Sequence, residues 1–208
     1  APCMHQFQTW MDQGGTFTDV VRVQDNGHLE ISKVLSDQAS LAELGSNAQE
    51  VRRGTTVATN ALLERTGAPV LLITNVGFGD MPTIGDQRRP HLFQLQIERP
   101  PSLATAVVEA AGRISAEGRV LEPVSVDEQV LRAHKHSGIE SVAIVLIHGP
   151  LHPGTELKLA GICRSIGFRH VSIGHEVAPS RGYLARLHTT LADAALTPLL
   201  PRAPGLYM

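Results

Sequence analysis

The sequence of 208 residues predicts a mixed α/β fold that opens with an antiparallel meander of three strands. The first observation is that three strand-like segments, joined by tight turns that contain glycine, stand at the N-terminus. The second is that strand and helix patterns alternate after residue 54. Because the chain begins β–β–β, the pattern also differs from that of doubly wound folds, which begin β–α–β.

The meander follows from β-branched residues and turn chemistry at the N-terminus. A short strand is expected over Phe7–Met11 and a second over Thr16–Gln24, with a turn that contains the Gly14–Gly15 pair between them. The Asn-Gly sequence within Asp25-Asn26-Gly27 predicts another hairpin turn, which leads to a third strand over Leu29–Leu35. These segments predict one antiparallel sheet.

The middle of the chain combines a helix with a buried strand. A short helix is expected within Gln38–Gln49, and a clearer one over Val57–Arg65, which Gly67 ends. The apolar run Val70–Thr74 predicts a buried strand, and we expect it to join the sheet of the meander. Two irregular regions follow: Gly77–Gly85, a loop or a single helical turn, and Arg88–Pro101, which is bounded by prolines.

The C-terminal half predicts a second α/β layer. It starts with a hairpin of two strands and continues with alternating helices and strands. The first helix has Ser125 as its expected N-cap and Glu128 at the capping-box position. The expected elements are a hairpin of Val107–Ser115 with Arg119–Pro123, a helix over Ser125–Ser137, a strand over Glu140–His148, a helix over Gly154–Ile166, a strand over His170–Ile173 and a helix over Arg181–Leu196.

The composition excludes several classes of protein. Apolar residues make up 42% of the chain and charged residues 18%, which is typical of a folded domain and not of a disordered one. The net charge of −2 gives no global attraction to nucleic acid or to an anionic membrane. Cys3 and Cys163 are too few for a disulfide framework or a cysteine zinc site. With no run of about 20 apolar residues and no signal peptide in view, we expect a cytoplasmic protein.

The segment from Asp12 to Asp19, D-Q-G-G-T-F-T-D, is the strongest functional signal. Paired glycines let backbone N–H groups approach an anion, so Gly14 and Gly15 are candidate phosphate contacts, with positive φ expected at Gly15. The hydroxyl groups of Thr16 and Thr18 are candidate donors to phosphate, and Asp12 is a candidate ligand for Mg²⁺. The alternative is an ordinary hairpin turn, since no Walker A pattern is present.

A second candidate segment begins the helix after residue 56. Gly54, Thr55 and Thr56 precede the helix, whose free N–H groups form an anion site. Asn60 offers both an amide donor and an acceptor, which suits a phosphate or a lactam. The alternative is simple N-capping of the helix by Thr55 or Thr56.

Further candidates lie on loops and at strand ends. Arg88 and Arg89 are candidate clamps for a carboxylate or a phosphate, and the alternative is a solvated loop. His148 and His175 follow predicted strands and are candidate substrate contacts at the carboxyl end of a sheet. Their alternative is a role as core or surface histidines.

The chain resembles two nested families. Its N-terminal strand–turn–strand segment is similar to the phosphate-binding hairpin of the actin, sugar kinase and Hsp70 ATPases, which implies an actin-like (RNase H-like) lobe. A longer resemblance rests on the segments Gly14–Val21, Arg53–Thr66, Gly77-Phe78, Ile84-Gly85, Val145–Gly149 and Val171–Pro179, together with Trp10 and Lys33–Ser36. Through these segments, over residues 7–200, the chain resembles the hydantoinase A/5-oxoprolinase family, and within it the bacterial ATP-dependent 5-oxoprolinases.

The resemblance implies an ATP-driven reaction on a cyclic amide, with ATP and Mg²⁺ as cofactors. In the family, phosphorylation of the lactam oxygen of 5-oxo-L-proline allows water to open the ring to L-glutamate, a step of glutathione metabolism. The catalytic residues implied here are Asp12 and Asn60. The alternatives are a hydantoinase A-type subunit that acts on hydantoin or N-methylhydantoin, and a catalytically silent ATPase-like module.

The resemblance also implies partners, because family members are much longer. The 208 residues are expected to form one N-terminal domain, inactive alone, which subdivides into residues 1–105 and 106–208. The expected partners are the remainder of the ATPase and a hydantoinase B-like domain or subunit, in a homo-oligomer. The chain departs from the family pattern at charged positions, now occupied by Gln13, Gly79, Ala111, Gly112 and Thr155.

Overall fold

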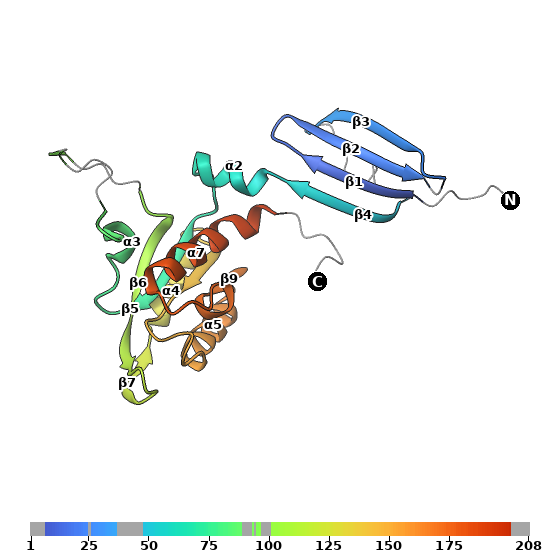
Figure 1. Cartoon of the computed structure of the whole chain (residues 1–208). Helices are drawn as coiled ribbons and strands as arrows, with labels where there is room; N and C mark the ends of the chain where they lie inside the picture. The colour runs from blue at the N-terminus through green and yellow to red at the C-terminus, as the bar shows by residue number, and fades with distance from the viewer. Residues whose placement is uncertain are drawn as a thin grey trace. The chain divides into compact units, whose positions relative to one another are not determined.

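The computed structural model describes residues 7–24, 26–36, 48–88, 93, 95–96 and 101–200. The chain divides into two compact units, Ala1–Glu64 and Arg65–Met208, and each is described by itself. Both units contain a mixed sheet (Figure 1), so the α/β fold class expected from the sequence is confirmed. The boundary between the two units lies after Glu64, earlier in the chain than the boundary expected after residue 105.

The first unit contains a four-stranded sheet in the order β3-β2-β1-β4. The meander is formed by β1 (Phe7–Gln13), β2 (Phe17–Gln24) and β3 (Leu29–Leu35), which pair antiparallel as predicted. A fourth strand, β4 (Ala48–Thr55), pairs parallel with β1 and was not predicted. Its sequence, A-Q-E-V-R-R-G-T, lacks the apolar alternation of a half-buried strand. Most of the expected helix Gln38–Gln49 lies outside the described residues.

The register of this sheet separates a buried face from an exposed one. Thr9 and Met11 of β1 and Thr18 and Val20 of β2 are buried, as the two-residue period of a strand requires. The predicted helix is present as α2 (Val57–Glu64), immediately after β4. The parallel pairing of β1 with β4 thereby brings the end of β1 to the start of α2.

The second unit is built on a five-stranded sheet in the order β7-β6-β5-β8-β9. All neighbours pair parallel except the predicted hairpin of β6 with β7, which is antiparallel. The expectation that Val70–Thr74 joins the meander is wrong: this segment, β5, is the central strand of the second sheet. All of its residues are buried, because a central parallel strand is covered on both faces. The strands are β5 (Val70–Asn75), β6 (Ala104–Ile114), β7 (Val120–Ser125), β8 (Ser141–Ile144) and β9 (His170–Ile173).

Helices cover both faces of the second sheet. On one face, Leu71 and Ile73 of β5 pack in a cluster with residues of α4 and α5. On the other, Val70 and Leu72 pack in a cluster with residues of α7. The helices of this unit are α3 (Met81–Ile84), α4 (Glu128–His136), α5 (Gly154–Ile166), α6 (Gly174–Val177) and α7 (Tyr183–Leu196), followed by the short η1 (Thr197–Leu199).

Two boundaries differ from the prediction for identifiable reasons. Ser125 ends β7, and the N-cap of α4 is Asp127, whose carboxylate accepts a hydrogen bond of 2.8 Å from the Gln129 N–H. The strand expected over Glu140–His148 ends at Ile144. Beyond it, side chains take the place of strand neighbours, because Glu156 accepts from the Leu146 N–H and Asn75 accepts from the Ile147 N–H.

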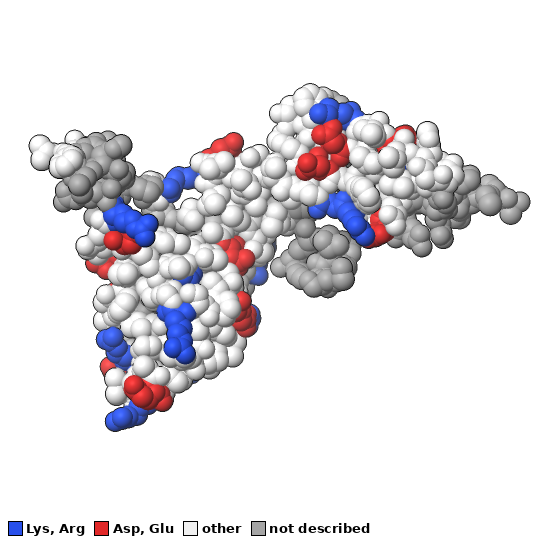
Figure 2. All heavy atoms as spheres, in the orientation of Figure 1, with Lys and Arg blue, Asp and Glu red and all other residues white. Residues whose placement is uncertain are grey.

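The surface carries charges of both signs. Figure 2 shows lysine, arginine, aspartate and glutamate side chains interspersed over the visible face of the described residues. No described helix combines the length and the apolar character needed to cross a membrane. Within the described ranges, no three His, Cys, Asp or Glu side chains gather closely enough to hold a metal ion.

Candidate functional site

The turn between β1 and β2 is tied down by its own backbone and by the end of β3. The Gly14 N–H donates to the Phe17 carbonyl at 2.9 Å, and the Ser36 N–H donates to the Thr16 carbonyl at 2.9 Å. The Ser36 hydroxyl also donates to the Gly14 carbonyl at 2.9 Å. Among the described residues, the N–H groups of Gly15 and Thr16 have no partner. The turn therefore presents two free backbone donors in a fixed loop.

Close approach, and not the backbone angles, favours glycine in this turn. A Cβ on Gly14 would lie 3.0 Å from the Phe17 carbonyl oxygen, and one on Gly15 would lie 3.3 Å from the Asn60 side-chain nitrogen. The positive φ expected at Gly15 is wrong, since neither glycine is among those with positive φ. Gly14 instead lets the turn close tightly on itself, and Gly15 lets the turn and α2 approach each other closely.

Asp12 and Gly54 face each other across the parallel pairing of β1 and β4. A Cβ on Gly54 would lie 3.4 Å from a carboxylate oxygen of Asp12, which is ordinary contact distance. The start of α2 is held by two threonines. The Thr55 hydroxyl accepts from the Val57 N–H at 3.2 Å, and the Thr56 N–H donates to the Gln13 carbonyl at 3.1 Å. Capping by Thr55, the alternative interpretation, is therefore present in the structure.

Thr18 supports the turn from the buried side of the sheet. Its side chain is fully buried, and its hydroxyl lies 3.0 Å from the Ser36 hydroxyl. Gln13 accepts a hydrogen bond from the Arg53 guanidinium on the same sheet. The structure thus brings Asp12, Gly15 and Asn60 together at one end of the sheet of the first unit. The other predicted residues at this end are Gly14, Thr16, Gly54, Thr55 and Thr56. Thr18 instead has an internal partner, Ser36.

Arg88 lies in the second unit on an exposed loop. Its guanidinium forms an ion pair of 2.8 Å with Asp86, and its side chain is 89% exposed. Its backbone N–H also donates to Asp86 at 3.1 Å. Arg89 lies outside the described residues. These contacts are those of the solvated loop that the sequence left open as the alternative.

His175 belongs to a buried hydrogen-bonded pair that the sequence did not reveal. It lies in α6, and its ring Nδ1 is 2.6 Å from a carboxylate oxygen of Glu156, which also accepts from the His175 backbone N–H at 3.0 Å. Glu156 is fully buried, and its other oxygen accepts from the Leu146 N–H at 2.8 Å. A charge with three such partners is a fixed structural element.

Arg186 of α7 completes the same buried region. It is fully buried and donates to the carbonyls of Ser180, at 2.7 Å, and Ile147, at 3.1 Å, as well as to that of Leu146. Burial lowers the pKa of the Arg186 guanidinium, and the Glu156 carboxylate and Tyr183 oppose that shift. No local pattern in the sequence marks Glu156 or Arg186, because the fold supplies their hydrogen-bond partners.

Two of the residues at which the chain departs from the family pattern, Gly79 and Gly112, have a direct structural cause. The carboxylate of Glu109 accepts from the N–H groups of Gly77 and Gly79, at 3.0 and 2.8 Å. A Cβ on Gly79 would lie 2.8 Å from that carboxylate oxygen. Gly112 has φ +87° at an irregularity between β6 and β7, and its Cβ would lie 2.2 Å from the Pro123 carbonyl oxygen. Both glycines therefore fit this particular backbone.

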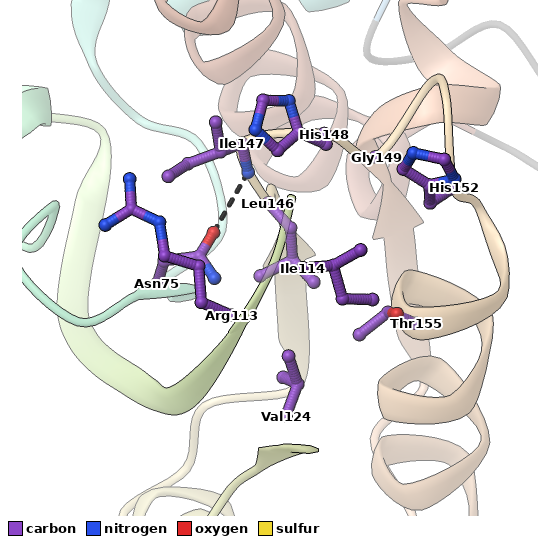
Figure 3. Close-up of a pocket in the computed structure, with 10 residues that line it drawn as sticks. All are labelled: Asn75, Arg113, Ile114, Val124, Leu146, Ile147, His148, Gly149, His152 and Thr155. Atoms are coloured by element: carbon purple, nitrogen blue, oxygen red, sulfur yellow. Dashed lines mark hydrogen bonds between the residues drawn. The ribbon is translucent and has the colours of Figure 1, made fainter. Parts of the chain in front are cut away.

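His148 lines a pocket at the carboxyl end of the second sheet (Figure 3). It lies in the turn over residues 147–151 and not in a strand, contrary to the expected strand end. Residues from β5, β6 and β7, from the segment after β8 and from the start of α5 surround the pocket. The lining residues are Asn75, Arg113, Ile114, Val124, Leu146, Ile147, His148, Gly149, His152 and Thr155.

Comparisons with known proteins agree with this architecture. A 5-oxoprolinase of Saccharomyces cerevisiae is 33% identical over 249 residues, covering 92% of this chain and 19% of the yeast protein. Caprolactamase subunit alpha of Pseudomonas jessenii is 28% identical over 225 residues, covering 95% of this chain and 32% of that subunit. The crystal structure of the ATP-dependent caprolactamase from that organism matches with a TM-score of 0.75 and 25% identity, covering 92% of this chain and 32% of that chain.

The chain thus spans between 19% and 32% of the length of these relatives. The family described as the hydantoinase/oxoprolinase N-terminal region matches residues 8–167, well over half of the sequence. On this match and on the identity to 5-oxoprolinase, the chain belongs to the hydantoinase/oxoprolinase N-terminal family.

Proposed function

We propose that the chain supplies the phosphate-binding N-terminal lobe of an ATP-dependent hydrolase of cyclic amides, with 5-oxo-L-proline opened to L-glutamate as its reaction. Family membership supports the general activity, and the 5-oxoprolinase relative supports the substrate. The observation that carries the proposal is the convergence of Asp12, Gly15 and Asn60 at one end of the first sheet.

The residues at this end of the sheet fit a magnesium–nucleotide complex. The free N–H groups of Gly15 and Thr16 are donors for phosphate oxygens, as phosphate-binding turns require. The Asp12 carboxylate faces Gly54, where the missing side chain leaves room beside it. Carboxylate and water are the ligands that Mg²⁺ prefers. The donor set and the open space therefore suit ATP and Mg²⁺.

When bound, ATP supplies a phosphoryl group that turns the lactam oxygen into a leaving group. The residues of this chain position and neutralise charge in that reaction, which is most of what phosphoryl transfer demands of a protein. Asp12 would hold Mg²⁺, Gly14, Gly15 and Thr16 would hold phosphate, and Asn60 would orient the reacting groups beside Gly15.

The remaining contacts of such an enzyme would come from elsewhere. The relatives are three to five times longer than the part they share with this chain. The proposal therefore includes the rest of the ATPase and a hydantoinase B-like domain or subunit. We also propose assembly into a homo-oligomer and a cytoplasmic location. Arg88, His148 and His175 lie in the second unit. We also propose that they contact the substrate, and this part of the proposal must be tested in the complete enzyme.

The test is calorimetric titration of the chain in its natural full length with ATP, with and without Mg²⁺. Asp12→Asn removes a charge at nearly constant shape and should weaken Mg²⁺-dependent binding by about tenfold, the effect expected of one charge-assisted contact. Glu30→Gln is the matched control, because it removes an exposed carboxylate from β3 of the same sheet.

Three outcomes separate the candidate functions. Weakened binding in Asp12→Asn alone, with ADP released when 5-oxoproline is added, supports the proposal. ADP release with hydantoin or N-methylhydantoin in place of 5-oxoproline makes the chain hydantoinase A-like. Wild-type protein that binds no ATP up to millimolar concentration is a silent ATPase-like module, and the proposal is then wrong.

A further inference from the structure

The two faces of the sheet in the first unit differ in what covers them. Successive residues of a strand point to opposite faces. The side chains that are buried on one face include Thr9, Met11, Thr18 and Val20. The other side, which we call the open face, carries apolar side chains that remain exposed to solvent, and the exposed fraction of Ile31 reaches 72%. The apolar residues of the open face are Trp10, Phe17, Val21, Val23, Leu29, Ile31 and Leu35.

The strand register makes these apolar residues neighbours. Trp10 of β1 pairs with Val21 of β2, and Val21 pairs with Ile31 of β3. Beside them, Val23 pairs with Leu29. Side chains that lie directly opposite on adjacent strands are in contact range, so the five residues form one continuous surface. Single exposed apolar residues are ordinary, but a contiguous apolar patch marks a surface that packs against something.

The charged groups of the open face are paired with one another. The ammonium group of Lys33 lies 3.2 Å from the Asp19 carboxylate and 5.7 Å from the centre of the Phe17 ring. Arg52 of β4 forms an ion pair of 2.8 Å with Glu50. The open face therefore has no surplus of positive charge, which attraction to an anionic membrane or to a nucleic acid requires. Its chemistry suits an apolar protein surface.

Helices are the natural cover for such a sheet. Parallel strand pairs are normally covered by helices on both faces, and β1 and β4 pair parallel. The sheet of the second unit has helices on both of its faces. In the first unit the described helix, α2, follows the end of β4 (Figure 1), and the open face stays exposed. Four strands about 4.8 Å apart present a width that one or two helices, each about 10 Å across, would fill.

The relatives have ample polypeptide for this layer. The part that they share with this chain is 19% of the yeast 5-oxoprolinase and 32% of caprolactamase subunit alpha. More than two thirds of each relative therefore lies outside the shared part. A protein of that length can supply the cover from its own chain, without a second molecule.

We propose that the open face is covered by one or two amphipathic helices from a part of the polypeptide beyond these 208 residues, with apolar side chains packed on Trp10, Val21 and Ile31. The proposal rests on the proposed function only in requiring a longer polypeptide, and neither ATP nor substrate enters its test. Asp12 lies two residues beyond Trp10 on the same face of β1. The covering layer would therefore also border the proposed Mg²⁺ site.

The test is cysteine labelling of the protein in its natural full length, at two neighbouring positions of β3. Ile31→Cys places a thiol on the open face, and Glu30→Cys places one on the opposite face of the same strand, where Glu30 is also exposed. Each variant is treated with a maleimide, and mass spectrometry of the labelled peptide gives the rate relative to that in urea. Ile31→Cys should react at least about tenfold more slowly than Glu30→Cys, because only a covered thiol must wait for the protein to open.

A charge at the same position gives a second readout. Ile31→Glu would bury a carboxylate beneath the covering helices, so it should lower the melting temperature of the full-length protein by at least about 3 °C. Glu30→Gln, the matched control, breaks only an exposed ion pair with Arg22 and should lower it by less than about 1 °C. Equal shifts would contradict the proposal.

The labelling outcomes separate the possible covers. Protection of Ile31→Cys that persists after dilution by about a hundredfold supports a layer from the same polypeptide, and protection lost on dilution would identify a second molecule. Equal rates at the two positions, both fast or both slow, would show that the open face is not selectively covered. Rapid labelling that only phosphatidylglycerol vesicles suppress would identify a membrane surface. Each result other than the first overturns the proposal.

The proposed function and this proposal can fail separately. A full-length protein that shields Ile31→Cys but binds no ATP would refute the nucleotide site and support the covering layer. A protein that binds ATP with Ile31→Cys freely reactive would do the reverse.

Discussion

The side-chain amide of Asn60, on α2, lies 3.3 Å from the point that a Cβ on Gly15 would occupy. This contact joins the turn after β1 to the helix after β4, two segments that are far apart in the sequence. It exists because β4 pairs parallel with β1 and so delivers α2 to the same end of the sheet. The glycine and the asparagine therefore form one structural unit.

Coupling between these two residues can be measured. Gly15→Ala should lower the free energy of unfolding by about 1 kcal/mol, because its Cβ crowds the Asn60 amide. The same change in an Asn60→Ala background should cost much less, which gives a coupling energy of roughly 0.5–1 kcal/mol. Urea denaturation followed by the fluorescence of Trp10, the only tryptophan, reports on this unit. Strictly additive effects would show that the contact carries no energy.

Local pattern explains why much of the fold could be predicted. The meander follows from turn residues and β-branched runs, which act between neighbours in the sequence. Helix α5 and strand β9 match their predicted bounds, because their periodicity and their flanking glycines are local signals. The sheet to which β5 belongs could not be predicted this way. Parallel pairing joins segments with no turn between them, so no local pattern specifies the partner.

The same distinction applies to the candidate sites. Asp12, Gly15 and the start of α2 carry visible motifs, and β1–β4 pairing brings them together. Glu156 and Arg186 carry no such signal, because a charge becomes a buried group only through partners that the fold supplies. Asn75 was missed for a similar reason, since its importance depends on the Ile147 N–H, 72 positions away.

The buried carboxylate of Glu156 should be essential to the second unit. Glu156→Gln places an NH₂ group against the donors of His175 and removes the negative charge beside Arg186, so it should destabilise the unit by about 3 kcal/mol. Glu128→Gln is the matched control, since it removes an exposed carboxylate that pairs with Arg132 in the first turn of α4 and should cost less than about 1 kcal/mol. Urea denaturation followed by circular dichroism measures both, and equal costs would contradict the assigned role.

Gly112 and Gly138 provide a matched pair of glycines. Both have positive φ, +87° and +96°, but a Cβ on Gly112 would lie 2.2 Å from the Pro123 carbonyl oxygen while one on Gly138 would meet nothing within 4 Å. Gly138→Ala should cost about 1 kcal/mol for backbone strain alone. Gly112→Ala should cost at least about twice that, because the hairpin must also move. Melting temperatures of the two variants that differ by little would show that the clash relaxes freely.

Cys163 should make the stability of the second unit depend on pH in the alkaline range. Its side chain is fully buried in the core, and burial raises the pKa of its thiol from 9.0 to about 12. As the pH rises, the unfolded chain therefore loses this proton before the folded chain does. The contribution of Cys163 is fully present below pH 9 and is lost as the pH rises through the folded pKa of about 12.

The wild-type chain should consequently lose about 1 kcal/mol more stability than Cys163→Ala between neutral pH and one unit above the unfolded pKa. Tyr183, whose pKa burial also raises, affects both chains alike, so the difference between them isolates the thiol. In a Cys3→Ser background, the native thiol should also react with a disulfide reagent only as fast as the unit opens. Equal pH slopes in the two chains, together with rapid native labelling, would show that Cys163 is accessible to water and that its burial in the core is wrong.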